Sequence, residues 1–295
     1  MANISANTSL LNETIDYDYD DLVLEYNKKV FIIHVVTCII ICIGLPLILM
    51  AIYALYSLVK NDHVAPIYII NLLISDLIQL CCMIVWESKP KEDMIDNTVN
   101  SIYKFGQLTS IGFMVCISLE RYLVIAHPLW YRFRRTIRIT VAVCVVVWII
   151  PLVLIFTVFP WITLFVTDII LSIFLITPFP LFIFFLVGTL RALSTSVSVP
   201  SEEKWRIVAI LVLVLLIYTL LFLPSIIFFT AKTYAFDLTL IFLAHIFVKL
   251  SPLADLLLYV FIRKGAVGKL LTSVCCCRKE NNDTNTISTI NLDNT

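Results

Sequence analysis

Seven apolar stretches, each long enough to cross a lipid bilayer, constrain this chain more than any other feature. A helix needs about 20 apolar residues to cross the roughly 30 Å hydrocarbon layer. Runs such as Ile207–Phe229 lack the alternation of polar and apolar residues that strands of a membrane barrel require. The sequence therefore predicts an all-α integral membrane protein, a bundle of seven transmembrane helices. The spans are expected at Val30–Leu58, Pro66–Trp86, Thr98–Tyr122, Thr140–Trp161, Asp168–Leu193, Trp205–Ala231 and Leu238–Ile262.

Composition places most of the chain in lipid. Hydrophobic residues make up 60% and charged residues 14% of the chain, whereas a water-facing surface needs roughly 25% charged residues. The 21 basic and 21 acidic residues give a net charge of zero, so no excess of positive charge favours a nucleic acid. We therefore expect membrane lipid around the bundle and no nucleic-acid partner.

The lysines and arginines of the connecting loops predict the orientation, because these residues concentrate on the cytoplasmic side of a membrane. Alternate loops carry Lys60, the cluster Arg132–Arg138 and Arg263. The opposite loops and the N-terminal segment are rich in aspartate and glutamate. We expect a multi-pass protein of the plasma membrane with an extracellular N-terminus and a cytoplasmic C-terminus.

Three segments follow from this topology. Residues 1–29 are expected to form an extracellular, glycosylated and acidic N-terminus, and residues 30–264 the seven-transmembrane bundle. Residues 265–295 are expected to form a short amphipathic eighth helix and a short cytoplasmic tail. No apolar leader precedes the first span, which is expected to act as its own insertion signal.

Covalent modification is expected at both ends of the chain. Sequons of the form N-x-S/T predict glycans at Asn3, Asn7 and Asn12 on the outer side. After the last span, cysteines that follow a short amphipathic stretch suit S-palmitoylation, although three unmodified thiols fit the same residues. These cysteines are Cys275, Cys276 and Cys277.

Polar residues inside the spans are costly in lipid and mark function by default. Asp76 and Asp255 lie in the second and seventh spans, and Ser110 lies about midway along the third. Two carboxylates and a hydroxyl at similar depth could hold a structural Na⁺, because hard cations prefer oxygen ligands, or could share a proton. A hydrogen-bond network between helices, with one carboxylate protonated, would explain the same residues. No other cofactor is expected.

The third span ends at Glu120-Arg121-Tyr122, where Glu120 can pair locally with the Arg121 guanidinium. With this motif at the cytoplasmic face, the chain resembles the rhodopsin-like (class A) G-protein-coupled receptors over about residues 30–277. The other motifs that carry the resemblance are Asn71 and Asp76, His127-Pro128-Leu129, Trp148, Phe222-Leu223-Pro224, and Asp255 with Tyr259.

Two branches of this family share further motifs with the chain. Gly44-Leu45-Pro46 and the run Glu120–Leu129 are similar to the proton-sensing and related lipid or peptide receptors. The run Pro128–Arg132 and a very short second outer loop are similar to the Mas-related receptors instead. Proton sensing is not favoured, because neither the outer loops nor the N-terminus contain a histidine.

The resemblance implies a mechanism of signalling to a heterotrimeric G protein. Arg121 would leave Glu120 on activation and meet the Gα subunit as the sixth helix swings outward. Pro224 would be the point about which that helix pivots, and Phe222 would be the toggle at the floor of the ligand pocket. Tyr259 would swing inward to stabilise the open state. Asp76, Ser110 and Asp255 would form the sodium pocket.

Several positions depart from the family pattern. Ile48 stands where the first helix usually carries asparagine, and Leu256 replaces the proline expected after Asp255. Asp96 stands where the third helix usually begins with a cysteine, so the usual bridge to the second outer loop is missing. These departures predict weak coupling or unusual basal activity.

A ligand pocket is expected between the outer halves of the helices. Lys249 has three possible roles there: a structural partner of Glu87, an anchor for an anionic ligand group, or the attachment point of retinal. Retinal is disfavoured because Val99 occupies the position of the required counterion. The pocket residues predicted from the sequence are Glu87, Tyr103, Lys104, Asp168, His245 and Lys249, with Phe105 and Tyr234 nearby.

The extracellular ligand could be a peptide, a lipid or another small molecule. Tyr17 and Tyr19 lie among aspartates, a setting that suits either tyrosine sulfation and a basic peptide ligand or a plain solvated tail. The alternative to a receptor is a transporter or channel that uses Asp76, Asp255 and Lys249 as a polar pathway. No internal repeat supports a transporter, and no catalytic or metal motif supports an enzyme.

Overall fold

The computed structural model describes residues 2–60, 67–88, 93–127, 129, 137–195, 201–231 and 238–260, and these ranges contain helices and no strand. Seven helical spans in them are long and apolar enough to cross a membrane, which confirms the predicted all-α bundle. The α-helices are α1 (Ala2–Lys60), α2 (Ile67–Glu87), α3 (Asp93–Ala126), α5 (Ile137–Val153), α6 (Leu164–Ile176), α7 (Pro178–Thr195), α8 (Ser201–Ala231) and α9 (Leu238–Lys249), with further helix at 251–260.

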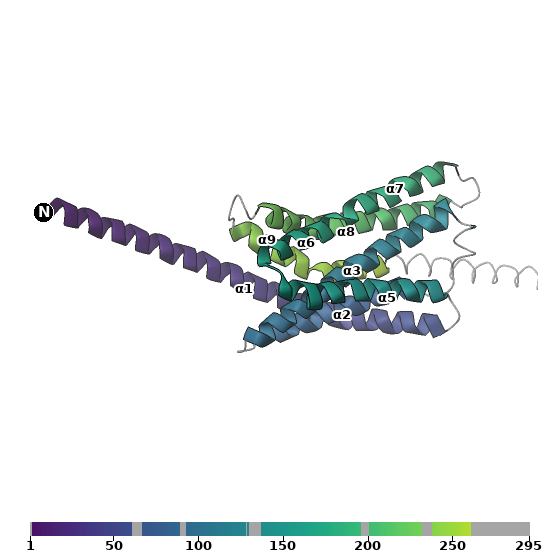
Figure 1. The fold of residues 1–295 in the computed structure, drawn as a ribbon, viewed down its shortest axis with the longest axis horizontal. Coiled ribbons are helices and arrows are strands. Elements are labelled where there is room, and N and C mark those ends of the chain that lie inside the picture. Colours follow the sequence, from purple (N-terminus) through teal and green to yellow (C-terminus); the bar gives the residue numbers. More distant parts are fainter. Residues whose placement is uncertain are drawn as a thin grey trace, which may run out of the picture.

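The first helix is much longer than the predicted span. We expected a span at Val30–Leu58, whereas α1 begins at Ala2 and its apolar part covers Val23–Tyr56. Figure 1 shows the N-terminal half of α1 (purple) extending beyond the bundle that the other helices form. The predicted amphipathic eighth helix, Tyr234 and the cysteines at 275–277 lie outside the described residues. The structure describes the helical backbone of the glycosylation sequons but not their side chains.

Three spans are interrupted, each near proline or at a change of helix type. In the fourth, α5 gives way to a π-helical turn at Leu154–Val158 and a 3-10 turn at Phe159–Trp161. In the fifth, Thr177 separates α6 from α7, and Pro178 and Pro180 lack the backbone N–H that a continuous helix needs. In the seventh, Leu250 separates α9 from the helix at 251–260. The sequence predicted all three as single helices, because apolar length alone does not reveal such breaks.

Helix α3 occupies the centre of the bundle. In its most apolar window 61% of the residues are buried, compared with 17% for the span Ile137–Trp161. It contacts α2, α5, α7 and α8, and Figure 1 shows it crossing between them. The exposed side chains of the outer helices are mostly leucine, isoleucine, valine and phenylalanine, as expected of surfaces that face lipid.

Glycine allows the helices to approach closely at two positions on opposite sides of α3. A Cβ atom on Gly106 would lie 3.0 Å from Gln79 Cγ and 3.1 Å from the backbone oxygen of Ser75, so α2 packs directly on this glycine. On the other side, a Cβ atom on Gly188 of α7 would lie 2.6 Å from Cε2 of Tyr122. Small residues at such contacts bring helices together in lipid.

Candidate functional site

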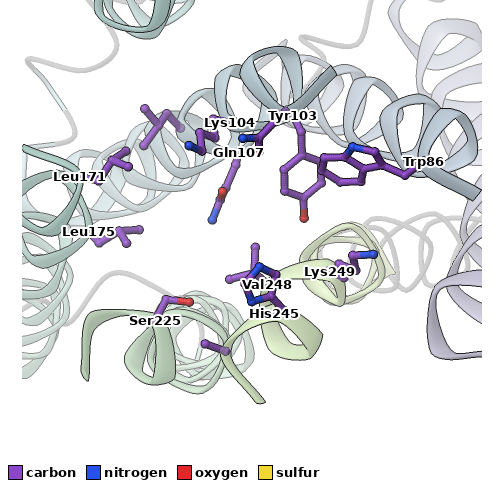
Figure 2. A pocket seen from close by; sticks show the side chains of 13 residues that line it. Trp86, Tyr103, Lys104, Gln107, Leu171, Leu175, Ser225, His245, Val248 and Lys249 are labelled. Carbon is purple, nitrogen blue, oxygen red and sulfur yellow. The ribbon is translucent and has the colours of Figure 1, made fainter. Parts of the chain in front are cut away.

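A cavity of about 170 Å³, here called the bundle cavity, lies between α2, α3, α6, α8 and α9 (Figure 2). It lies near the N-terminal end of α3, where Lys104 is 17 residues, or about 25 Å along a helix axis, from Arg121. The residues that line it are Trp86, Asn100, Tyr103, Lys104, Gln107, Leu108, Leu171, Leu175, Ser225, Ala244, His245, Val248 and Lys249.

Four of the six predicted pocket residues line the bundle cavity: Tyr103, Lys104, His245 and Lys249. Glu87 is not among the lining residues. Its Oε2 lies 2.8 Å from Nδ1 of His34 on α1 instead. The side chain of Asp168 lies outside the described residues.

Sequence reasoning missed the rest of the lining. On α3 the missed residues Asn100, Gln107 and Leu108 repeat at the spacing of one helical face through Tyr103 and Lys104, so helical periodicity could have found them. No comparable local signal marks Leu175 or Ser225, because their place depends on how α6 and α8 pack. Phe105, expected near the pocket, packs on Trp148 with ring centroids 5.5 Å apart.

Tyr103 presents a buried hydroxyl to the bundle cavity. Its side chain is 6% exposed, and its ring packs on Trp86 with centroids 4.9 Å apart. Among the described residues the hydroxyl has no hydrogen-bond partner. Figure 2 shows it directed across the cavity toward Val248 and Lys249 on α9. A buried hydroxyl of this kind is costly unless it finds a partner, so this atom is a strong candidate for contact with a ligand.

Lys249 connects α9 to α1. Its Nζ donates a hydrogen bond of 3.0 Å to Oγ1 of Thr37, whose hydroxyl in turn donates to the backbone oxygen of Ile33. The ammonium also lies 5.5 Å from the centre of the Trp86 ring, in reach of a cation–π interaction. Glu87 interacts with Lys249 electrostatically, but the hydrogen bond goes to Thr37.

The two intramembrane carboxylates meet in the core. Asp76 and Asp255 are completely buried and interact with each other directly. Gln79 donates to Oδ1 of Asp76 at 3.3 Å. Several buried oxygens here have no hydrogen-bond partner among the described residues: Asp76 Oδ2, both carboxylate oxygens of Asp255, Gln79 Oε1 and Ser251 Oγ.

Such a set of oxygens fits a hard monovalent cation. Two adjoining carboxylates cannot both stay ionised in a low-dielectric core without a positive charge or a shared proton between them. Ser110, predicted as a third ligand, is fully buried on α3, and its hydroxyl donates to the backbone oxygen of Gln107 at 3.2 Å. A sodium ion would be held chiefly by the carboxylates of Asp76 and Asp255.

The Glu120-Arg121-Tyr122 motif lies in the last two turns of α3. Arg121 Nε is buried and has no hydrogen-bond partner among the described residues. Tyr122 packs against α7: its ring centroid lies 5.7 Å from that of Phe184 and 5.8 Å from that of Phe185, and its edge rests on Gly188. The tyrosine thus fixes this end of α3 to α7 and leaves the arginine beside that contact.

Helix α8 carries the predicted toggle and pivot. Phe222 is completely buried but does not line the bundle cavity; its ring packs on Tyr218 with centroids 4.8 Å apart. Pro224 lies within α8 and removes one backbone hydrogen bond there. Tyr259, in the helix 251–260, is 7% exposed.

Tyr218 is an inter-helix contact that the sequence did not reveal. Its hydroxyl donates a 2.7 Å hydrogen bond to the backbone oxygen of Leu175, two residues before the break between α6 and α7. Its ring packs on Phe179 and Phe182 of α7, with centroids 5.0 and 5.1 Å away. Tyr218 therefore holds α8 to both parts of the broken fifth span.

Part of this chain is similar in sequence to known proteins. The family model for seven-transmembrane receptors of the rhodopsin family matches residues 47–166. G-protein coupled receptor 68 of Homo sapiens is 27% identical over 155 residues, which cover 50% of this chain and 40% of that receptor. The type-1 angiotensin II receptor of Oryctolagus cuniculus is 26% identical over 107 residues, 34% of this chain and 30% of that receptor.

The chain thus matches less than half the length of these curated relatives. The relatives are receptors rather than enzymes. The match to the family model includes the second and third spans and the Glu120-Arg121-Tyr122 motif. Over residues 47–166 the chain is therefore similar to the seven-transmembrane receptors of the rhodopsin family.

Proposed function

We propose that this receptor converts the binding of an extracellular ligand (a peptide, a lipid or another small molecule) into activation of heterotrimeric G proteins. It does so at the plasma membrane, with its N-terminus outside and its C-terminus in the cytoplasm. The observation that carries the proposal is Arg121, whose buried Nε lacks a partner among the described residues, at the opposite end of α3 from the bundle cavity.

The geometry supports a two-state mechanism. The bundle cavity is lined by five helices, so a ligand there contacts α6, α8 and α9 as well as α3. A ligand that binds one arrangement of these helices more tightly shifts the population toward it. Pro224 weakens α8 between the cavity and the cytoplasmic end, so α8 is the helix that moves when the arrangement changes. Arg121 then becomes accessible to the Gα subunit.

A sodium ion between Asp76 and Asp255 fits this scheme as a structural element. When bound, the ion would supply positive charge to two buried carboxylates on α2 and on the helix 251–260. Those residues join neighbouring helices at the centre of the bundle, so neutralising their charges favours the compact arrangement.

The alternative of a polar transport pathway receives less support. Asp76 and Asp255 are fully buried, and Lys249 bonds to Thr37 of α1. These three residues therefore belong to two separate polar clusters among the described residues.

The test measures GDP release from purified G proteins of each Gα class by the receptor in lipid nanodiscs, with and without candidate ligands. Arg121→Ala should lower receptor-stimulated GDP release at least tenfold, because it removes the guanidinium that meets Gα. Arg138→Ala is the matched control, since Arg138 is an exposed arginine near the same end of the bundle. Equal GDP release with Arg121→Ala and with the unmodified receptor would contradict the proposal. A lack of stimulated GDP release with every Gα class and every candidate ligand would contradict it too.

A further inference from the structure

We propose that the bundle cavity binds a small amphiphile with an anionic head group, and that Tyr103 and Lys249 are its two anchors. This inference rests on the proposed receptor function and names the chemical class of its ligand. It follows from three properties of the lining: its charge, one unsatisfied hydroxyl and its apolar walls.

The charge of the lining is positive. Lys104 and Lys249 both line the bundle cavity, whereas none of the described lining residues is aspartate or glutamate. The neighbouring carboxylate of Glu87 contacts His34 on α1 and also interacts electrostatically with Lys249, but it does not line the cavity. In a low-dielectric site, charges of one sign favour a ligand group of the opposite sign and reject a like charge. The lining therefore favours an anionic ligand group over a cationic one.

The Tyr103 hydroxyl supplies a directional contact. It is buried, unpartnered among the described residues and aimed across the cavity toward α9. A carboxylate oxygen would accept its hydrogen bond and satisfy an otherwise orphaned donor. The ring cannot swing away easily, because it packs on Trp86 at a centroid distance of 4.9 Å.

Lys249 supplies the charge at the facing wall. An ammonium has three donors, and one of them goes to the neutral hydroxyl of Thr37. The hydroxyl carries no charge, and the Glu87 carboxylate interacts with the lysine electrostatically without a hydrogen bond to it, so the ammonium keeps donors for an anion while Thr37 and the Trp86 ring hold it in place. Tyr103 and Lys249 thus offer two different hydrogen-bond donors to one head group from α3 and α9.

The remaining walls call for an apolar body. Leu108, Leu171, Leu175 and Val248 line the cavity beyond the two anchors, and apolar surface buried against them stabilises the complex. A volume of about 170 Å³ suits a small molecule rather than a folded peptide segment. A medium-chain carboxylate has both required parts, a head group for the anchors and a tail for the leucines.

The experiment measures direct binding to the full chain in nanodiscs, without G protein, so that it is independent of signalling. The three test compounds are octanoate, its neutral amide octanamide and the cation octylamine, each with empty nanodiscs as the blank. We expect octanoate to bind at least tenfold more tightly than octanamide and to raise the Tm, since a ligand that binds the folded state stabilises it. Octylamine should not bind above the blank.

Variants assign the preference to the two anchors. Lys249→Met should abolish the preference for octanoate over octanamide, and Lys249→Arg should retain it because the charge remains. Tyr103→Phe, which keeps the ring, should weaken octanoate binding about tenfold. Lys28→Met and Tyr53→Phe are the matched controls, because both residues are exposed on α1, and they should bind octanoate like the unmodified chain.

Three results would overturn the inference: octanamide or octylamine binding as tightly as octanoate, no compound binding above the blank, or a preference that survives both Lys249→Met and Tyr103→Phe. These results are separable from a failure of the proposed function. A chain that stimulates GDP release from a G protein through Arg121 but does not bind octanoate remains a receptor for another ligand class. A chain that binds octanoate but stimulates no GDP release from any G protein keeps this site and loses the signalling role.

Discussion

Asp76 and Asp255 show how single residues set the properties of a membrane core. Both carboxylates are fully buried, and together they leave three oxygens without a hydrogen-bond partner among the described residues. Ile48, where the resemblance to the receptor family leads one to expect asparagine, is also fully buried and offers no side-chain hydrogen bond. The two buried carboxylates therefore depend on a cation or a shared proton to offset their charge.

This dependence predicts a sodium effect on stability. In sodium chloride the unmodified chain should have a Tm about 2–4 °C higher than in choline chloride of equal ionic strength, because a bound cation stabilises the folded state. Asp76→Asn and Asp255→Asn should each remove the difference in Tm, since each replaces one of the two carboxylates that would hold the ion. Tm values of detergent-solubilised protein measure the effect.

Asp93→Asn provides the control for this sodium effect. Asp93 is an exposed acid in the first turn of α3, so its replacement should leave the sodium difference intact. If the Asp76→Asn chain gained as much stability from sodium as the unmodified chain, the carboxylate pair would not be the cation site.

The sequence predicted which residues are unusual better than it predicted their partners. Asp76, Lys249 and Asp255 stood out because an ionisable residue in an apolar run is a local signal. Their contacts are not local: Lys249 bonds to Thr37, 212 positions earlier in the chain. The sequence near Thr37 and the sequence near Lys249 give no sign that the two residues pair. The sequence alone therefore could not decide whether Lys249 is a structural partner of Glu87, an anchor for an anionic ligand or the attachment point of retinal.

At the scale of helices, the contact between Tyr122 and Gly188 fixes how α3 meets α7. The Tyr122 ring fills the space that a side chain at residue 188 would need, with 2.6 Å between Cε2 and an added Cβ. A ring edge held between Phe184 and Phe185 has little room to retreat. This packing positions the end of α3 that carries Arg121.

Gly188→Ala should therefore destabilise the receptor. Overpacking of this kind costs about 1–3 kcal/mol, which outweighs the roughly 0.5–1 kcal/mol that alanine gains over glycine within a helix. We expect a lower Tm and an altered basal GDP release, because Tyr122 must move. The double variant with Tyr122→Leu should recover part of the lost stability, and a double-mutant cycle would measure the coupling.

Gly44→Ala is the control for this steric argument. A Cβ atom on Gly44 would lie 3.3 Å from Cδ2 of Leu253, the end of a flexible side chain that can adjust. The Tm of Gly44→Ala should therefore stay unchanged or rise slightly. Equal losses of stability in both variants would show that the Tyr122 contact has no special role.

The extents of the helices were predictable and their interruptions were not. Apolar length located all seven spans, because lipid imposes that length directly on the sequence. The breaks at Thr177 and Leu250 depend on which backbone carbonyls find other partners, and that is decided by packing. Prolines follow both breaks closely, Pro178 and Pro180 after Thr177 and Pro252 after Leu250, but Pro46 lies within the unbroken α1, so a proline alone does not predict a break.

For the whole molecule, the predicted orientation has a direct consequence. An epitope tag at the N-terminus should be accessible on intact cells, and a tag at the C-terminus only after permeabilisation. Asn3, Asn7 and Asn12 would then lie on the glycosylated side. Replacing all three with glutamine should abolish the gel shift that glycosidase treatment causes in the unmodified chain. Two tags on the same face would contradict an odd number of spans, and with it the placement of Arg121.

The hydrogen bond between Tyr218 and Leu175 connects the lining of the bundle cavity to helix α8. Leu175 contributes its side chain to the bundle cavity and its backbone oxygen to Tyr218 on α8. Tyr218 lies two helical turns from Ser225, the nearest cavity residue on the same helix. A molecule that shifts Leu175 would therefore move α8 at Tyr218, on the N-terminal side of Pro224, where α8 does not line the cavity. The fifth span is interrupted at Thr177, just beyond Leu175, so α6 can transmit such a shift to α8 without the whole span moving as one rigid helix.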